Sequence, residues 1–157
     1  MIRSRGQSVL YAVLLMPTLF LIFALAVDMA SLQMQKLRLR YAVDLATVTA
    51  ATAVDAPYYS RTGRLQLDPV TAAATAREYL VRNLAAIPDI ASPTTIADAA
   101  DTRVVNRTPA IDPYTGGHLD RPAICARIRA PYRFMLLGWI GFNEVELTVA
   151  ADAEIRT

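Results

Sequence analysis

The sequence predicts an α+β protein: an N-terminal transmembrane helix extends into an amphipathic stalk helix, and a small domain follows with one further helix packed on an antiparallel sheet. Three observations predict this fold. Residues 8–27 contain no charged side chain. Residues 28–56 contain no helix breaker and carry apolar residues at helical spacing. The last third of the chain alternates apolar and polar residues, as strands with one buried face do.

The apolar run at residues 8–27 has the length of a membrane span. As a helix, its 20 residues reach about 30 Å, the thickness of the hydrocarbon core of a bilayer. Pro17 lies inside the run, and a membrane helix tolerates proline there because its neighbours satisfy the freed carbonyl. A cleaved signal peptide has a shorter apolar region and a small-residue cleavage site, which Ala24 and Ala26 match only weakly. We therefore expect an uncleaved anchor, rather than a removed signal or a buried soluble helix.

The helix is expected to continue as a stalk over residues 28–56, with one apolar stripe at spacings of three and four. A stripe of this kind packs against its own domain or against a helix of another subunit. We call it the α-helical seam; it consists of Met34, Leu37, Tyr41, Leu45 and Val48. The predicted organisation is a short basic segment (1–7), the transmembrane helix (8–27), the stalk (28–56) and a small α+β domain (57–157).

Within the domain, the sequence places its elements by caps and by period. Pro57 is expected to end the stalk, and Gly63 to form a turn. Asp68 and Pro69 read as an N-cap and a first helical residue, for a helix that ends near residue 86. A connector is expected to run from Pro88 to residue 93. Strands are expected at 102–108, 123–130 and 145–155, with a glycine-rich turn at 112–120 between the first two.

Residues for catalysis are scarce. His118 is the only histidine, and no nucleophile-elbow, phosphate-loop or CxxC motif is present. Asp112, His118 and Asp120 lie close together, but such residues are typical of a turn, and we expect no metal there. We predict no catalytic residue, no cofactor and no metal, and therefore no enzyme. Cys125 is the only cysteine, so the chain has no internal disulfide, and its apolar surroundings predict a buried, inert thiol.

The net charge of +2 arises from scattered arginines, with no basic run between aromatics, so nucleic acid is not an expected partner. Residues 134–142 form an apolar segment for which two interpretations stay open. It either covers the sheet as part of the core, which we favour, or forms an exposed patch that touches a membrane or a partner. The residues of this docking patch are Phe134, Leu136, Leu137, Trp139 and Phe142.

Several features stand together in the first 55 residues: Arg5-Gly6, Pro17 in the apolar helix, Ala26-Val27-Asp28 where that helix leaves the membrane, the basic stretch at 36–40, and the alanine-rich segment at 42–53. With these features the two ends of the chain resemble the TadE/TadG-like proteins of the tight-adherence (Flp) pilus system. The C-terminal strands, with the aromatic-Leu-Leu-Gly segment between them, also resemble the family's ending. The resemblance covers roughly the first 55 and last 35 residues.

This resemblance implies a pilin-like minor subunit or an accessory membrane protein of pilus assembly. It implies a single-pass protein of the bacterial inner membrane, with a cytoplasmic N-terminus and its domain outside. The charges alone leave the orientation open, because Arg3 and Arg5 precede the run while Lys36, Arg38 and Arg40 follow it. The implied partners are membrane lipid, other pilin-like subunits and platform proteins of the inner membrane. The competing interpretation is a signal-anchored ligand-binding or sensory domain unrelated to pili.

The resemblance also suggests a processing site. Prepilin peptidase cuts such pilins after a glycine, and the fifth residue of the mature chain is usually glutamate. Cleavage between Gly6 and Gln7 would place Tyr11 at that position. The missing carboxylate favours an uncleaved accessory protein over a polymerising pilin. The intact mass of the protein from its own membranes separates a chain that begins at Met1 from one that begins at Gln7.

Overall fold

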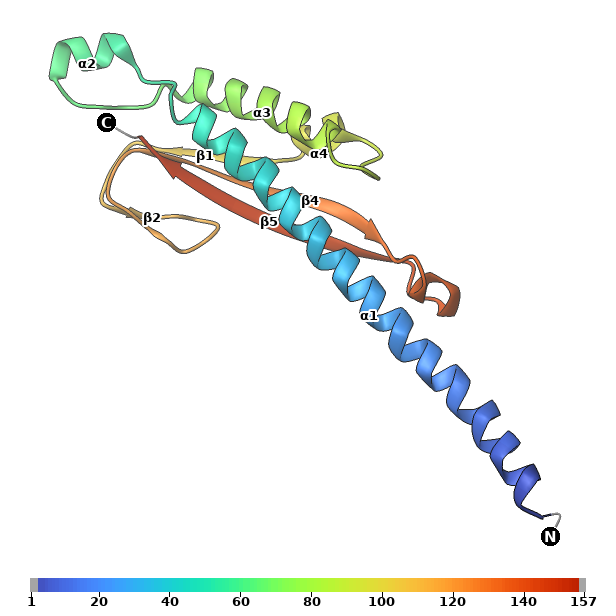
Figure 1. Ribbon diagram of the computed structural model, residues 1–157. Helices are drawn as coiled ribbons and strands as arrows, with labels where there is room; N and C mark the ends of the chain where they lie inside the picture. Colours follow the sequence, from blue (N-terminus) through green and yellow to red (C-terminus); the bar gives the residue numbers. More distant parts are fainter. Residues whose placement is uncertain (1–2, 156–157) are drawn as a thin grey trace. The chain divides into compact units, whose positions relative to one another are not determined.

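The computed structural model describes residues 3–155, with side chains described from residue 11 onward. It confirms the α+β class: a long N-terminal helix and shorter helices precede an antiparallel sheet (Figure 1). The helices are α1 (Arg3–Ala50), α2 (Ala56–Thr62), α3 (Pro69–Ala85), α4 (Pro93–Asp98) and the 3-10 turn η1 (Leu137–Ile140). The strands are β1 (Asp101–Val105), β2 (Ala110–Ile111), β3 (His118–Leu119), β4 (Ala123–Arg133) and β5 (Glu144–Glu154).

The chain forms two compact units. Unit 1 comprises the chain up to Gln35 together with Pro131–Val145, and unit 2 comprises Lys36–Ala130 with the C-terminal residues from Glu146. The expected stalk, residues 28–56, is shared between the units, and its second half supplies buried residues to unit 2. Those residues are Leu39, Ala42, Val43, Ala46 and Ala50.

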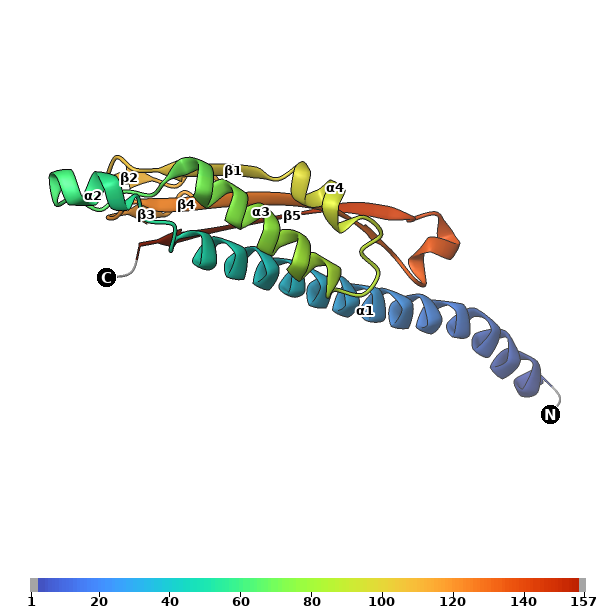
Figure 2. The ribbon, with the colours of Figure 1, turned by 90° about the horizontal axis from the view of Figure 1, so that it is seen from above.

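In unit 2, β4 lies between β1 and β5, and β1 pairs antiparallel with β4 from Asp101 opposite Arg127 to Val105 opposite Ala123. Helix α3 lies along the sheet and beside the C-terminal part of α1 (Figure 2). The Asn83 amide on α3 donates to the carbonyl of Ala42 on α1 at 3.2 Å. One apolar core joins these elements; it contains Ala50, Ala51, Leu67, Ala72, Ala76, Ile124 and Ile155.

The predicted start of α3 is confirmed. Asp68 accepts a hydrogen bond from the backbone of Val70 at 3.1 Å, and Pro69 is the first helical residue. A carboxylate at this position satisfies an N–H that has no partner within the helix. The buried face of α3 consists of Ala72, Ala76, Leu80 and Leu84, whereas Val70 is exposed.

Two short helices were not predicted. Pro57 does not end the first helix: α1 ends at Ala50, and Pro57 stands in the first turn of α2. Asp55 caps α2 by accepting from Tyr58 N at 2.8 Å, and Gly63 ends it with a left-handed φ of 66°. Pro93 likewise starts α4 where a connector was expected to end. At Pro57, a proline in a first helical turn was misread as a breaker, although its missing N–H costs nothing there.

Strand β4 is buried on both faces at its N-terminal end, not on one face as predicted. Ala123 and Cys125 pack with Leu119 in a second apolar cluster, partly covered by Val105 and Tyr114. On the opposite face Ile124 belongs to the main core. The alternation of Cys125 with Ile124 therefore reflects two apolar environments. The prediction holds better further along, where Arg129 is exposed between buried Ile128 and Ala130.

Candidate functional site

The connection between β4 and β5 is a short, closed turn in unit 1, which we call the 134–143 turn. Phe134 N donates to the carbonyl of Asn143 at 3.3 Å and closes its base. Phe142 N donates to the carbonyl of Leu137 at 3.2 Å, across η1. Gly141 ends η1 at a φ of 100°, a conformation that favours glycine. The turn is therefore held by its own backbone.

Asp28 attaches this turn to α1. Its carboxylate accepts from Met135 N at 3.1 Å, from Leu136 N at 3.0 and 3.2 Å, and from Leu137 N at 2.6 Å. Asp28 itself is fully buried. Three converging N–H groups at the start of a helical turn form a site for a carboxylate, because they have no partner inside the turn. The bonds span more than a hundred residues of sequence and are the main polar link within unit 1 among the described residues.

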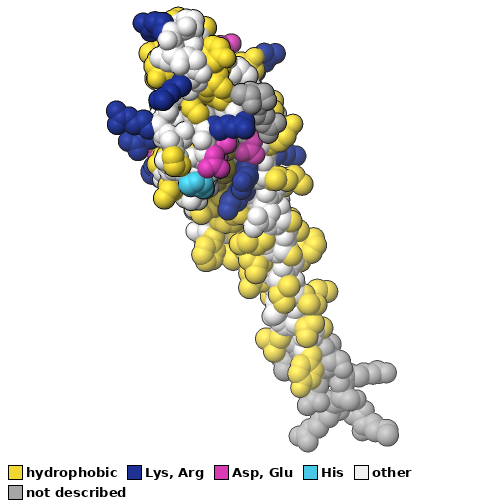
Figure 3. Space-filling view, turned by 90° about the vertical axis from the view of Figure 1, so that its left-hand side faces the viewer, with side chains coloured by type: hydrophobic (Ala, Val, Ile, Leu, Met, Phe, Trp, Pro, Cys, Tyr) yellow, Lys and Arg dark blue, Asp and Glu magenta, His cyan; other side chains and the backbone are white. Residues whose placement is uncertain are grey.

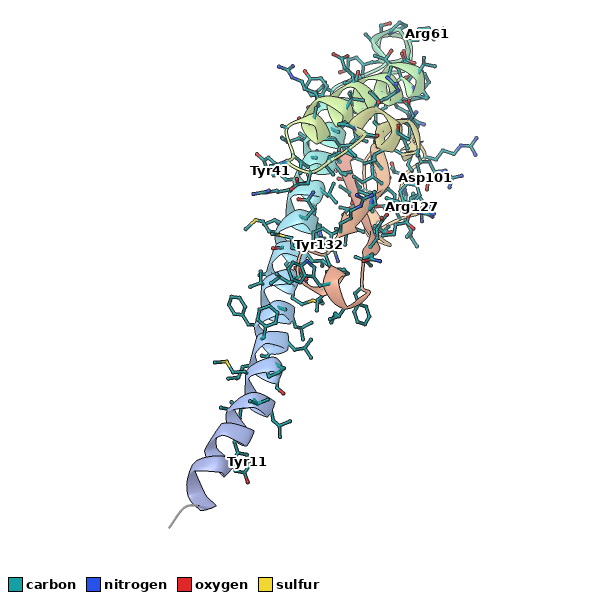
Figure 4. The ribbon with its side chains drawn as sticks, turned by 90° about the vertical axis from the view of Figure 1, so that its right-hand side faces the viewer. Tyr11, Tyr41, Arg61, Asp101, Arg127 and Tyr132 are labelled. Atoms are coloured by element: carbon teal, nitrogen blue, oxygen red, sulfur yellow. The ribbon has the colours of Figure 1, made fainter. Side chains whose placement is uncertain are left out.

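Tyr132 shows in which direction the chain runs along α1. Its hydroxyl lies 3.5 Å from the carbonyl oxygen of Asp28, and it also interacts with Ser31 (Figure 4). Burial raises the pKa of Tyr132, against the effect of its hydrogen bond with Ser31. From Tyr132 the chain passes to the amides bound by Asp28, and so runs toward the N-terminal end of α1. Ala24, one helical turn before Asp28, is the only buried side chain in residues 11–26, which fits a cover by this turn.

The predicted docking patch is divided by the structure. Leu137 is buried, and Phe134 and Leu136 are half-buried, with the Phe134 ring edge-on to Tyr132 at 5.4 Å between centroids. Trp139 is 86% exposed and Phe142 is exposed too. Met135 and Ile140, which were not predicted, are also exposed. The core interpretation therefore fits Leu137, whereas the tip of the turn presents four large apolar side chains to the outside.

The predicted helical seam lies on the outer face of α1. In unit 2, Leu37, Tyr41, Leu45 and Val48 are exposed, while the neighbouring face of the helix supplies Val43 and Ala46 to the interior. Tyr41 projects from α1 on the side away from the strands (Figure 4). Met34 is exposed in unit 1. Of the two interpretations, packing against the protein's own domain is wrong; packing against another helix stays a prediction.

The remaining predicted sites are placed as follows. Gly6 and Gln7 lie near the start of α1, outside the residues whose side chains the structure describes. Asp112 caps a turn, accepting from Tyr114 N at 2.8 Å and from the Thr115 hydroxyl, as the turn interpretation predicts. His118 Nε2 lies 3.1 Å from Asp120 Oδ1. Within residues 3–155 no three His, Cys, Asp or Glu side chains gather as metal ligands would.

A pair of carboxyl groups next to Cys125 was not predicted. The Thr115 hydroxyl hydrogen-bonds Asp112 and lies 3.4 Å from Asp152 Oδ1, so the two carboxyl groups are neighbours in unit 2. Burial and the charge of Asp112 raise the pKa of Asp152. The pKa of Asp112 is lowered, because burial raises it but the hydrogen bonds that its carboxylate accepts lower it further. Burial and the charge of Asp112 raise the pKa of Cys125 to about 12, so this thiol is unreactive at neutral pH.

Replacing Asp152 with asparagine is expected to raise the melting temperature at pH 7 by about 2 °C, and less at pH 4. The raised pKa of Asp152 means that its stabilising, protonated form is present at low pH and is lost as the pH rises through its folded pKa. At pH 7 two carboxylates then repel each other, and asparagine removes that repulsion. Thermal unfolding of the detergent-solubilised chain measures the effect. Glu78→Gln, the same charge change at an exposed site on α3, should shift neither melting temperature, and an equal gain at both pH values would contradict the repulsion.

The comparison with known families concerns the N-terminal part of the chain, which carries the seam and Asp28. Residues 6–53 match the family model Tad, described as "Putative Flp pilus-assembly TadE/G-like". Over this segment the chain is TadE/TadG-like. The match includes the apolar run, Asp28 and the whole seam, and it supports involvement in Flp pilus assembly. No curated protein and no solved structure matches the chain.

The TadE/G-like segment also carries the one helix among the described residues that is long and apolar enough to cross a membrane. Its side chains from Tyr11 to Phe23 are all exposed, unlike those of a helix in a soluble core. Figure 3 shows hydrophobic and uncharged side chains along the visible face of this part of α1. These features fit a single-pass membrane anchor.

Proposed function

We propose that this TadE/G-like protein is an accessory membrane protein or minor pilin-like subunit of Flp pilus assembly, and that it acts by helix packing without catalysis. It is anchored once in the bacterial inner membrane, with its N-terminus in the cytoplasm and unit 2 outside. Its partners are other pilin-like subunits and platform proteins of the inner membrane. Tyr11, in place of a glutamate, favours a chain that prepilin peptidase leaves uncleaved, with an intact mass of 17.2 kDa.

The exposed seam is the observation that carries this proposal. An apolar stripe that unit 2 leaves uncovered favours assembly with another helix, whereas a ligand-binding or sensory domain calls for a pocket with convergent polar groups. Leu37, Tyr41 and Leu45 succeed one another on one side of α1, each one turn from the next. Large apolar side chains at this spacing are what helix-in-groove and helix-to-helix contacts use.

Replacing Leu45 with arginine is expected to reduce the number of surface pili in the native host at least about tenfold, because an unpaired charge in a helix interface is costly. Leu45 is exposed, so the variant should fold and reach the membrane as well as the wild type does. Pili are counted by electron microscopy, with the amount of membrane-bound protein measured in parallel.

Val70→Arg is the matched control, because Val70 is 79% exposed on α3 and lies off the seam. It should leave piliation unchanged. Cysteine substitutions at the same two positions test the contact directly. Leu45→Cys should cross-link to a membrane partner, and Val70→Cys should not. The native Cys125 is buried and should not react. Normal piliation in Leu45→Arg, or equal loss in both arginine variants, would refute the seam as the assembly surface.

A further inference from the structure

The tip of the 134–143 turn has no cover within the described chain, although it holds some of the largest apolar side chains of unit 1. Met135, Trp139, Ile140 and Phe142 are between 56% and 86% exposed. Burying a side chain of this size is worth about 1.5–3 kcal/mol. A group of four such side chains on a closed turn marks an interaction surface rather than scattered exposure.

The position of the turn along α1 indicates what covers it. Asp28 is the first charged residue after the apolar run, so it stands where the helix leaves the hydrocarbon. Its carboxylate holds Met135, Leu136 and Leu137 by their amides at 2.6–3.2 Å. The turn is therefore fixed at the level of the membrane surface, whatever the placement of unit 2. Tyr132, near Ser31 and Asp28, shows that the chain approaches from the water side and runs toward the bilayer.

The amino-acid composition of the turn matches a position at the membrane surface. Tryptophan and other aromatic side chains concentrate at the membrane–water interface, because one end of the ring is polar and the rest is apolar. The base of the turn is charged instead: Arg133 and Glu144 lie 3.6 Å apart and both are exposed. Charged residues at the base and apolar residues at the tip are the distribution expected for a loop that dips into the interface from the water side.

We propose that the 134–143 turn is a second membrane contact of this protein, in which Trp139, Ile140 and Phe142 insert into the interfacial region of the lipid bilayer beside α1. The inference rests on the proposed membrane anchoring of α1 and adds a lipid-binding element from the C-terminal part of the chain. Asp28 is its positioning residue, because it fixes the turn on the helix that crosses the bilayer. The contact makes the turn and α1 a two-point attachment that sets how unit 1 stands on the membrane.

Trp139 is the only tryptophan of the chain, so its fluorescence reports on this turn alone. The full chain is placed in lipid nanodiscs made with phosphatidylcholine brominated either near the headgroup end or near the methyl end of its acyl chains. We expect headgroup-end bromine to remove about half of the Trp139 emission and methyl-end bromine much less, with an emission maximum blue-shifted from that of a water-exposed indole. Iodide in the water phase should quench it weakly.

A second variant separates this inference from the anchoring itself. Phe20→Trp in the Trp139→Phe background moves the fluorophore to α1, eight residues before Asp28 and about 12 Å along the helix axis. It should be quenched most by methyl-end bromine. If this reporter is not quenched, the anchoring, and with it the proposed function, is wrong. If it is quenched while Trp139 stays open to iodide and untouched by bromine, only the second contact is wrong, and the tip is left for a protein partner.

Discussion

Replacing Asp28 with alanine is expected to release the 134–143 turn from α1 at a cost of about 3 kcal/mol. The carboxylate bonds three backbone N–H groups at 2.6–3.2 Å in a buried position, and alanine leaves all three without an acceptor. Amide hydrogen exchange of residues 135–137 in nanodiscs measures the release. A cost of this size corresponds to exchange roughly 100-fold faster than in the wild type.

Two further variants are compared with Asp28→Ala. Asp28→Asn keeps one acceptor oxygen without the charge, and its exchange should fall between that of the wild type and that of alanine. Asp44→Ala removes a carboxylate from the same helix, where it forms an exposed ion pair with Arg40 at 3.9 Å that contributes little. Exchange at 135–137 should not respond to Asp44→Ala. Unchanged exchange in Asp28→Ala would show that the turn is held without this carboxylate.

Replacing Ile124 with alanine is expected to destabilise unit 2 by about 3 kcal/mol, or about 10 °C in melting temperature. Ile124 is fully buried in the cluster that joins the end of α1, α3 and the sheet, so the removed methylenes leave a cavity. The native reporter is Cys125, next in the chain and fully buried. The temperature at which its thiol begins to react with a maleimide gives the onset of unfolding of the detergent-solubilised chain.

Ile111→Ala is the matched control, since Ile111 is 70% exposed on β2. Its free energy of unfolding should change by less than about 0.5 kcal/mol, so its melting temperature should stay close to that of the wild type. If the two alanine variants unfold together, the cluster around Ile124 is not the core that holds unit 2.

The helical seam could be predicted as a stripe, but not whether it is buried. Met34, Leu37, Tyr41, Leu45 and Val48 were recognised as one stripe because helical spacing alone puts them on one side. The same spacing cannot tell which of two apolar faces is buried. Ala42, Val43 and Ala46 form a second stripe of smaller residues, and small side chains let α3 and the sheet approach closely. The larger residues are left outside.

Asp28 shows the limit of local inference more sharply. The sequence marks it as the first charge after the apolar run, and the resemblance marks it as part of Ala26-Val27-Asp28. Nothing local reveals that its acceptor oxygens meet the amides of Met135, Leu136 and Leu137, because these lie more than a hundred residues further along. A lone carboxylate at the end of a membrane helix was the available signal, since such a group needs donors.

By itself, the sequence determined the features that depend on neighbours in the chain: the apolar helix, the N-cap at Asp68 with Pro69, and the C-terminal strands. Each follows from residue spacing or from a bond within one helical turn. Only the tertiary structure decided which face of α1 is buried, that both sides of Cys125 and Ile124 are covered, and that Asp28 holds the turn with Trp139. These depend on contacts between distant segments, for which a single local pattern allows several partners and packing selects one.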